Sequence, residues 1–245
     1  LYGAGAGVCY LVCALGFACA CISTLCIRLV FAPRPRVPLS LATFVEVAHF
    51  MRARPDMLGA ISLDLFAVLL GGATAMLPVY ASDILHAGPI GLGLLRGAPA
   101  IGAVACSIIM VWKPLNHRAG ARMFLAVAIF GLATVVFAFS RSMAVSIIAL
   151  AVLGAADVVS VVVRSALVQL RTPDSMRGRV SAVNMLFIGS SNQLGEFESG
   201  MLATLIGPVE AVALGGIGTL VITGLWIRMF PTLWRVDRLD DITPQ

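Results

Sequence analysis

Long apolar segments recur along this chain of 245 residues and are separated by mostly short polar connections. A helix needs about 20 apolar residues to cross the hydrocarbon core of a bilayer. Because lipid offers no hydrogen-bond partners, each spanning segment must satisfy its own backbone, so these segments are expected to be helices. The short alternating segments of a membrane β-barrel are not seen. The predicted spans are Leu1–Leu29, Leu58–Ala81, Gly88–Trp112, Ala121–Ser140, Ala144–Leu170, Val180–Ile206 and Val209–Phe230.

The composition agrees with this pattern. Hydrophobic residues make up 60% of the sequence and charged residues only 12%, whereas a soluble domain carries about 25% charged residues. The chain has 24 glycines, concentrated in the apolar segments, and small residues let membrane helices approach closely. The sequence therefore predicts an all-α polytopic membrane protein whose helices form a packed bundle.

The basic residues mark one side of the membrane. Of the 17 lysines and arginines, only Arg141 falls in a connection on the opposite side, and Arg96 and Arg164 fall inside predicted spans. Basic connections remain in the cytoplasm, so the C-terminus is expected inside and the first span is expected to begin outside. Topology and attraction to anionic lipid then account for the net charge of +5, and nucleic-acid binding is not predicted.

Only one connection between the spans is long, and it covers residues 30–57. It begins with the proline-rich stretch Ala32–Pro38, which disfavours a helix, and continues with an amphipathic pattern that predicts a short helix on the cytoplasmic surface. The apolar positions of this pattern are Leu41, Phe44, Val45, Ala48 and Met51. The other connections are short, so consecutive helices are expected to pack as antiparallel neighbours. Pro78 and Pro99 lie inside predicted spans and are expected to bend them.

Several polar side chains fall inside the predicted spans. Asp64 shares a face with small residues, and Asp157 lies seven residues before Arg164, ~10 Å along a helix axis. These two side chains therefore either reach partway towards each other or each pair with another span. Asn184, Ser191 and Glu198 also repeat every seven residues and give the sixth predicted span a polar stripe, with Asn192, Gln193 and Glu196 off that stripe.

Two interpretations of these groups stay open. A charge in the membrane costs about 3 kcal/mol on insertion scales, so Asp64, Arg96, Asp157 and Arg164 could be ion pairs that fix helix register. For Glu198 and its stripe we favour a water-filled pathway, in which a carboxylic acid could bind and release a proton. A proton-coupled carrier needs such a group.

Metal, cofactor and catalytic sites are not predicted. Five of the six cysteines, Cys9, Cys13, Cys19, Cys21 and Cys26, lie in one apolar segment, and Cys106 lies in another. They lack zinc-ligand spacing and are interpreted as reduced, buried thiols. The three histidines fall in connections, and no motif of a hydrolase, nucleotide-binding loop or metalloprotease is found.

The loop before the sixth predicted span, Thr172–Ser181, has the sequence TPDSMRGRVS. This string resembles the corresponding loop of the major facilitator superfamily, in its enterobactin-exporter-like branch of drug and siderophore efflux permeases. Further segments resemble the same branch, and together they extend from about residue 58 to residue 239. These segments are Ser62–Phe66, Leu77–Ala81, Gly91–Arg96, Gly154–Asp157 and Ser191–Gly200.

The resemblance implies a helical bundle of twelve spans in two halves, of which this chain would hold spans six to twelve. Residues 1–29 would be the last span of the N-terminal half, 30–57 the central cytoplasmic connection, 58–230 the six-span C-terminal half, and 231–245 a cytoplasmic tail. The chain does not begin with Met and shows no features of a signal peptide. It is therefore interpreted as the portion of a carrier that lacks its N-terminal half, which a complete carrier would need.

The resemblance also implies a function. It implies alternating access around a site near the bilayer midplane, with protons as the coupling ion and export of a small amphipathic molecule across a bacterial inner membrane. The substrate- or proton-linked candidates are Asp64, Arg96, Asp157, Arg164, Asn184, Ser191 and Glu198. The candidates for a cytoplasmic gate are Arg118, Asp174, Arg177 and Arg179. Arg118, Gly120 and Arg122 match the superfamily's loop motif, whereas Lys113 and His117 depart from it.

Three other functional classes remain as alternatives. A transport-incompetent fragment or membrane scaffold would result if the other half of the carrier were missing. A lipid-modifying membrane enzyme would need clustered polar residues at an interface, whereas the polar residues here are deep and separated. A passive channel would need a selectivity ring, which no predicted span offers.

Overall fold

The computed structural model describes residues 6–27, 41–113 and 117–237, and it confirms an all-α fold, with helices and no strand among these residues. The chain divides into two units, residues 1–40 and 41–245, each of which is described by itself. In the first unit, α1 (Ala6–Cys26) is long and apolar enough to cross a membrane. The proline-rich stretch Ala32–Pro38, the predicted start at Leu1 and the tail beyond residue 237 lie outside the described residues.

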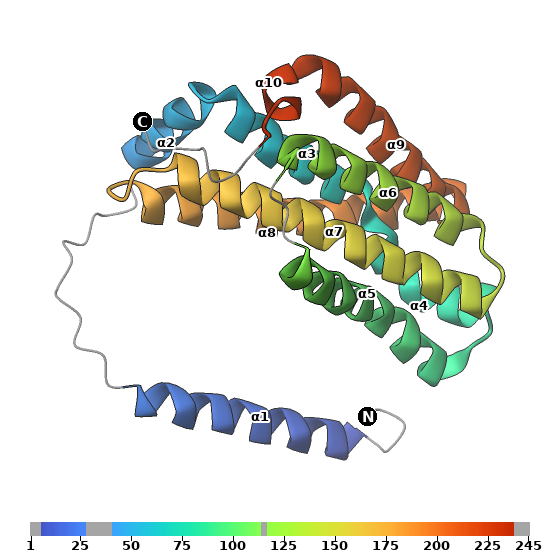
Figure 1. The fold of residues 1–245 in the computed structure, drawn as a ribbon. Coiled ribbons are helices and arrows are strands. Elements are labelled where there is room, and N and C mark those ends of the chain that lie inside the picture. The colour runs from blue at the N-terminus through green and yellow to red at the C-terminus, as the bar shows by residue number, and fades with distance from the viewer. Residues whose placement is uncertain (1–5, 28–40, 114–116, 238–245) are drawn as a thin grey trace. The chain divides into compact units, whose positions relative to one another are not determined.

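The second unit is a bundle of helices (Figure 1). Its elements are α2 (Leu41–Arg52), α3 (Pro55–Leu70), the 3₁₀ helix η2 (Gly72–Met76), α4 (Leu77–Val79), the π-helical turn η3 (Tyr80–Ile84), α5 (Gly88–Trp112), α6 (Ala119–Phe139), α7 (Met143–Arg171), α8 (Arg177–Ile206), α9 (Pro208–Met229) and α10 (Pro231–Trp234).

Six segments of the described chain are long and apolar enough to cross a membrane, and they correspond to six of the seven predicted spans. The remaining predicted span, the sixth along the chain (Val180–Ile206), lies within α8, a helix of 30 residues. This helix is long enough to cross a bilayer, but its polar stripe makes it less apolar than the others, so its membrane crossing stays a prediction. The element from Pro55 to Ile84 counts as one span although its helix is interrupted.

The expectation that consecutive helices pack together holds for α6 with α7 and for α8 with α9, but not for α5 with α6. α7 packs between α5 and α6, and α6 packs on its other side against α9 (Figure 1). α5 and α6 are consecutive but are not close neighbours, and α8 packs mainly on α3 and α9. Glycines allow a close approach of α5 and α7. A methyl group added at Gly102 of α5 would collide with the carbonyl oxygen of Ala151, and one at Gly154 of α7 with that of Pro99.

The helix of the second predicted span is interrupted before Pro78, the residue at which a bend was expected. α3 ends at Leu70, and the chain continues as the 3₁₀ helix η2 before Pro78 is reached. Gly71 and Gly72 stand at this point, and glycine is a weak helix former. A methyl group at Gly72 would collide with Ser199 of α8. Because residue 72 has no side chain, α8 can come close to the interrupted helix at this point. A larger residue at this position would force the two segments apart.

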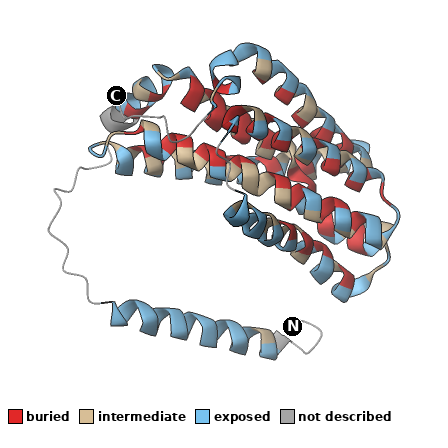
Figure 2. Cartoon of the chain, in the orientation of Figure 1, coloured by how far each residue is buried: buried red, intermediate tan, exposed pale blue. Residues whose placement is uncertain are grey.

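Buried residues occupy the inward faces of the bundle helices (Figure 2). Towards one end, Tyr80 stacks on Phe137 with ring centroids 4.5 Å apart and donates a hydrogen bond to the carbonyl oxygen of Ala138 over 2.9 Å. Towards the other end, the indole nitrogen of Trp226 donates to the Ser62 hydroxyl over 2.9 Å. Both contacts join segments that are far apart in the sequence, so they hold the bundle closed at each end.

The amphipathic helix predicted within the long connection is present as α2, but its buried face differs from the prediction. Val47 and Met51 are buried against α3 and α8, whereas Val45 is 69% exposed. The side chains of residues 41–44, which include two predicted apolar positions, lie outside the described residues. Of the three predicted apolar positions whose side chains the structure describes, only Met51 belongs to the buried face.

Candidate functional site

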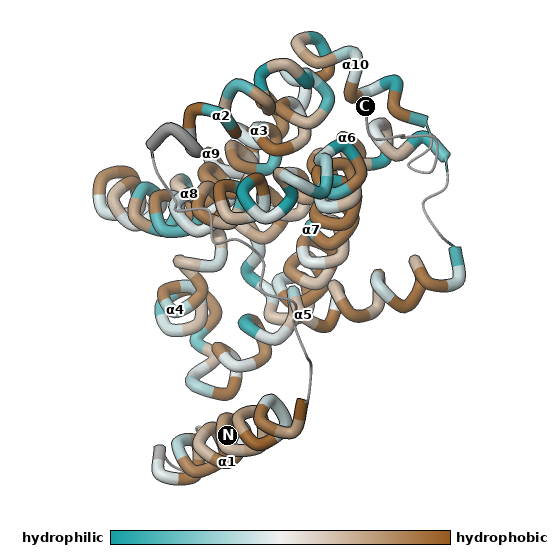
Figure 3. Tube along the Cα trace, turned by 90° about the vertical axis from the view of Figure 1, so that its left-hand side faces the viewer, coloured by the Kyte–Doolittle hydropathy of each residue, from teal (hydrophilic) through white to brown (hydrophobic). Residues whose placement is uncertain are grey.

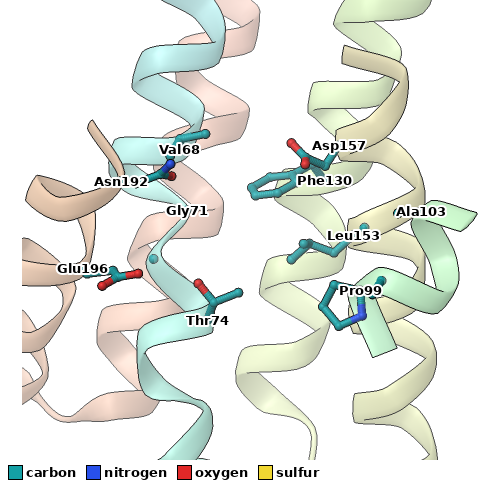
Figure 4. Close-up of a pocket in the computed structure, with 13 residues that line it drawn as sticks. Val68, Gly71, Thr74, Pro99, Ala103, Phe130, Leu153, Asp157, Asn192 and Glu196 are labelled. Atoms are coloured by element: carbon teal, nitrogen blue, oxygen red, sulfur yellow. The ribbon is translucent and has the colours of Figure 1, made fainter. Parts of the chain in front are cut away.

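A cavity of about 340 Å³ lies within the bundle, between α3, η2, α5, α6, α7 and α8. One wall carries Asp157 and Leu153 of α7 together with Phe130 of α6, and the opposite wall carries Asn192 and Glu196 of α8 (Figure 4). Most of the remaining lining is apolar, and Thr74 of η2 adds a hydroxyl group. A cavity with apolar walls and a few placed polar groups is the usual form of a small-molecule site.

The helix break forms one edge of this cavity. Gly71, Gly72 and Thr74 all line it, and they stand where α3 gives way to η2. Because a 3₁₀ helix has i to i+3 hydrogen bonds and a tighter turn, its residues point in directions that a continued α-helix would not give them. The break therefore turns Thr74 towards the space between α7 and α8 (Figure 4).

Asp64 and Arg164 form a buried ion pair between α3 and α7, with 3.2 Å between Arg164 Nε and Asp64 Oδ2. The two residues are 5% and 4% exposed. The Ser160 hydroxyl lies 3.5 Å from the other carboxylate oxygen of Asp64. Of the two arrangements that the sequence left open, Arg164 thus pairs with another span and not with Asp157.

Asp157 remains without a direct hydrogen bond or ion pair to its carboxylate among the described residues, and its side chain faces the cavity (Figure 4). The same holds for Glu196 on the opposite wall. The Ser160 hydroxyl donates to the backbone oxygen of Asp157 over 2.9 Å, which links the backbone of Asp157 to the neighbourhood of the ion pair. Val68 lines both the cavity and the small space beside Asp64 and Arg164.

The polar stripe of α8 does not coincide with the cavity wall. Ser191 is buried and faces the small space beside the ion pair, and Asn184 has a buried, unpartnered side-chain oxygen. Glu198 is not among the lining residues of the cavity, whereas Asn192 and Glu196 are. The heptad pattern of the sequence does not include these two residues, and no sequence signal points to Thr74.

Arg96 lies on α5, one to two helical turns from the lining residues Pro99, Ala100 and Ala103, and it is exposed. It does not line the cavity, and no acidic residue of the described chain is within ion-pair distance of it. The sequence had grouped Arg96 with possible ion pairs inside the bundle. The structure brings it to none of them.

The gate candidates lie at one end of the bundle, in separate contacts. Asp174 and Arg177 form an exposed pair at 2.8 Å, and Arg179 of α8 reaches Glu46 of α2 at 2.8 Å. The backbone N–H of Arg118 donates to the carboxylate of Asp237 over 2.7 Å, so the segment after α10 covers the start of α6.

A fourth contact at this end was not predicted. Arg171, the last residue of α7, binds Asp56 in the first turn of α3 at 2.8 Å. Arg54 donates a hydrogen bond to the backbone oxygen of Arg171. Hydrophilic residues gather around α2, α10 and the start of α6 (Figure 3). The connections in which the basic residues are concentrated therefore meet at one end of the bundle.

Metal binding has no support in the described residues, which contain no group of three or more His, Cys, Asp or Glu able to hold an ion. The described lining of the cavity includes two carboxylates, one amide and one hydroxyl. These groups can accept and donate hydrogen bonds, attract a positive charge and exchange protons with a ligand or with water.

Residues 42–244 match the family model described as transmembrane secretion effector. Among curated proteins, the enterobactin exporter EntS of Citrobacter koseri is 27% identical over 206 residues, which cover 80% of this chain and 47% of EntS. The multidrug efflux pump Tap of Mycobacterium bovis is 28% identical over 184 residues, covering 74% of this chain and 42% of Tap. The chain spans about half the length of the curated relatives it matches. No solved structure matches it.

Proposed function

Because this chain belongs to the transmembrane secretion effector family of the major facilitator superfamily, we propose that it is part of a secondary active transporter that exports small amphipathic molecules. The observation that carries this proposal is the cavity of about 340 Å³ with polar groups on opposite walls. The names of two relatives support export as the direction of transport. One is an enterobactin exporter and the other is a multidrug efflux pump. A siderophore and a drug are both within this substrate class.

Proton coupling forms the second part of the proposal. Asp157 and Glu196 line the cavity without a direct partner in the described chain, so these two carboxylates are the proposed proton-linked groups. Inward proton flow supplies about 2.3 kcal/mol per charge for each 100 mV of membrane potential. The Asp64–Arg164 pair is assigned a supporting role, in which it holds α7 against α3 beside the cavity.

Alternating access is the third part. The cavity lies next to the break between α3 and η2, and the sites of secondary transporters are typically formed by interrupted helices. The ion pairs Glu46–Arg179 and Asp56–Arg171 link helices at the cytoplasmic end and would have to move if that end opens. A complete carrier is proposed to include a second half, since the matched relatives are about twice as long as the matched region.

Proton movement in everted membrane vesicles that contain the complete carrier tests this function. With an acidic lumen and a pH-sensitive dye inside, an exported substrate should cause release of protons from the lumen. Asp157→Asn and Glu196→Gln should abolish the release, while Glu210→Gln, at the exposed start of α9, should keep it. A folded, inserted protein that moves no protons with siderophores or with drugs would favour the alternative of a transport-incompetent scaffold.

A further inference from the structure

We propose that the cavity selects organic cations, that is, molecules with a positive charge flanked by apolar groups, and disfavours anions. This inference rests on the transporter function proposed above and narrows its substrate class. It is carried by the balance of charge around the cavity. Two carboxylates, Asp157 and Glu196, line it from opposite walls, and none of the described lining residues is basic.

Neighbouring arginines do not neutralise these carboxylates directly. Arg164 is the basic residue of α7 nearest in sequence to Asp157, and its Nε lies 3.2 Å from the carboxylate of Asp64. Its charge is therefore opposed by a partner of its own. Arg96 belongs to α5 but is exposed and outside the lining. A ligand in the cavity thus meets two negative groups whose charge is not balanced by a direct partner in the described chain.

The remaining walls fit the apolar part of such a ligand. Phe130 presents its ring beside Asp157, and Leu153 and Pro99 continue the same wall (Figure 4). The face of an aromatic ring attracts a cation, so Phe130 and Asp157 together form one pole of the site. Glu196 and Asn192 form the other pole across the cavity. A cationic centre between the two poles is attracted from both sides.

An anionic ligand has no such fit. Its charge would lie between two carboxylates on opposite walls, and like charges repel each other. Asn192 and Thr74 could donate hydrogen bonds to it, but two neutral donors do not offset two like charges. Anionic ligands are therefore expected to be excluded.

Two ions of the same shape and opposite charge test this inference. Tetraphenylphosphonium and tetraphenylborate would be measured by equilibrium dialysis against the purified complete carrier in nanodiscs of zwitterionic lipid, with empty nanodiscs subtracted. We expect saturable binding of the phosphonium and none of the borate. Asp157→Asn and Glu196→Gln should each weaken phosphonium binding at least tenfold, and Glu210→Gln should leave it unchanged. The charge-retaining variants Asp157→Glu and Glu196→Asp should keep most of the phosphonium binding. They distinguish an effect of the lost charge from an effect of misfolding.

Saturable borate binding, or phosphonium binding that both neutral variants retain, would overturn the inference. The proton-release assay separates this failure from failure of the proposed function. Phosphonium binding that depends on the two carboxylates, without any proton movement, would support the cation site and count against transport. Proton release driven by an anionic siderophore, with no phosphonium binding, would support transport and overturn the selection of cations.

Discussion

At the scale of single residues, the neighbours of each membrane carboxylate decide what it can do. Asp64 is 5% exposed and is paired with Arg164, so its carboxylate has a partner within the protein. Asp157 and Glu196 face the cavity without a direct partner in the described chain. The same chemical group thus supports the structure at one position and is available to a ligand or proton at the others.

Asp64→Asn should destabilise the bundle, because it leaves the Arg164 charge buried and unpaired. Removal of one partner of a buried pair costs about 3–5 kcal/mol. Thermal unfolding in detergent should show a clear loss of stability, and the double variant Asp64→Asn/Arg164→Gln should recover part of it. The exposed pair Glu46–Arg179 provides the contrast, because an exposed pair contributes about 1 kcal/mol or less. Equal losses from both pairs would contradict this assignment.

The choice between Glu196 and Glu198 shows what the sequence of α8 could and could not predict. Asn184, Ser191 and Glu198 repeat every seven residues, and Ser191 of this repeat is buried. A straight helix drifts by about 20° for each heptad, so the stripe does not continue along one line. Which carboxylate reaches the cavity depends on where the interrupted helix meets α8, and that contact at Gly72 is not visible in the sequence pattern.

Substitution of these two glutamates gives a matched comparison on one helix. Glu196→Gln should abolish substrate-dependent proton release, because this side chain lines the cavity. Glu198→Gln removes the same charge two residues later and should have a much smaller effect. Proton release measured in everted vesicles decides between them. A loss confined to Glu198→Gln would support the pathway predicted from the stripe and contradict the assignment of the site to the cavity.

At the scale of helices, element positions were largely predictable and their partners were not. The predicted span Gly88–Trp112 coincides with α5, because long apolar segments define membrane helices well. The pairing of α5 with α7 depends on Gly102 and Gly154, two of many glycines in the chain. The break in the second span could have been suspected from Gly71 and Gly72, but two adjacent glycines alone do not distinguish a break from close packing.

Gly102→Ala should weaken the contact between α5 and α7, because the new methyl group would collide with the backbone oxygen of Ala151. Backbone atoms cannot rotate away as a side chain can, so the helices must separate. Gly93→Ala on the same helix is the control, since nothing of the described chain lies within 4 Å of its added carbon. We expect thermal stability in detergent to fall by several degrees for Gly102→Ala and to stay unchanged or rise slightly for Gly93→Ala.

At the scale of the whole molecule, the all-α polytopic fold and the superfamily were both predictable, and the match over residues 42–244 confirms the resemblance. These features follow from properties spread along the chain: apolar segment lengths, sorted charges and a loop motif. The cavity could not be predicted in the same way, because its lining comes from six elements. Its position depends on how those elements pack, which local patterns do not encode.

Orientation in the membrane remains a prediction, and it follows from charge at the same scale. Contacts such as Arg54 with Arg171, Glu46 with Arg179 and Arg118 with Asp237 bring the basic connections to one end of the bundle. Cytoplasmic loops are enriched in basic residues, so this end should face the cytoplasm and the connection with Arg141 should face outside. A fluorescent protein fused after Gln245 should be fluorescent in a bacterial host, and alkaline phosphatase inserted after Arg141 should be active. The reverse result would place the cavity in the opposite orientation, and the proposed direction of export would then fail with it.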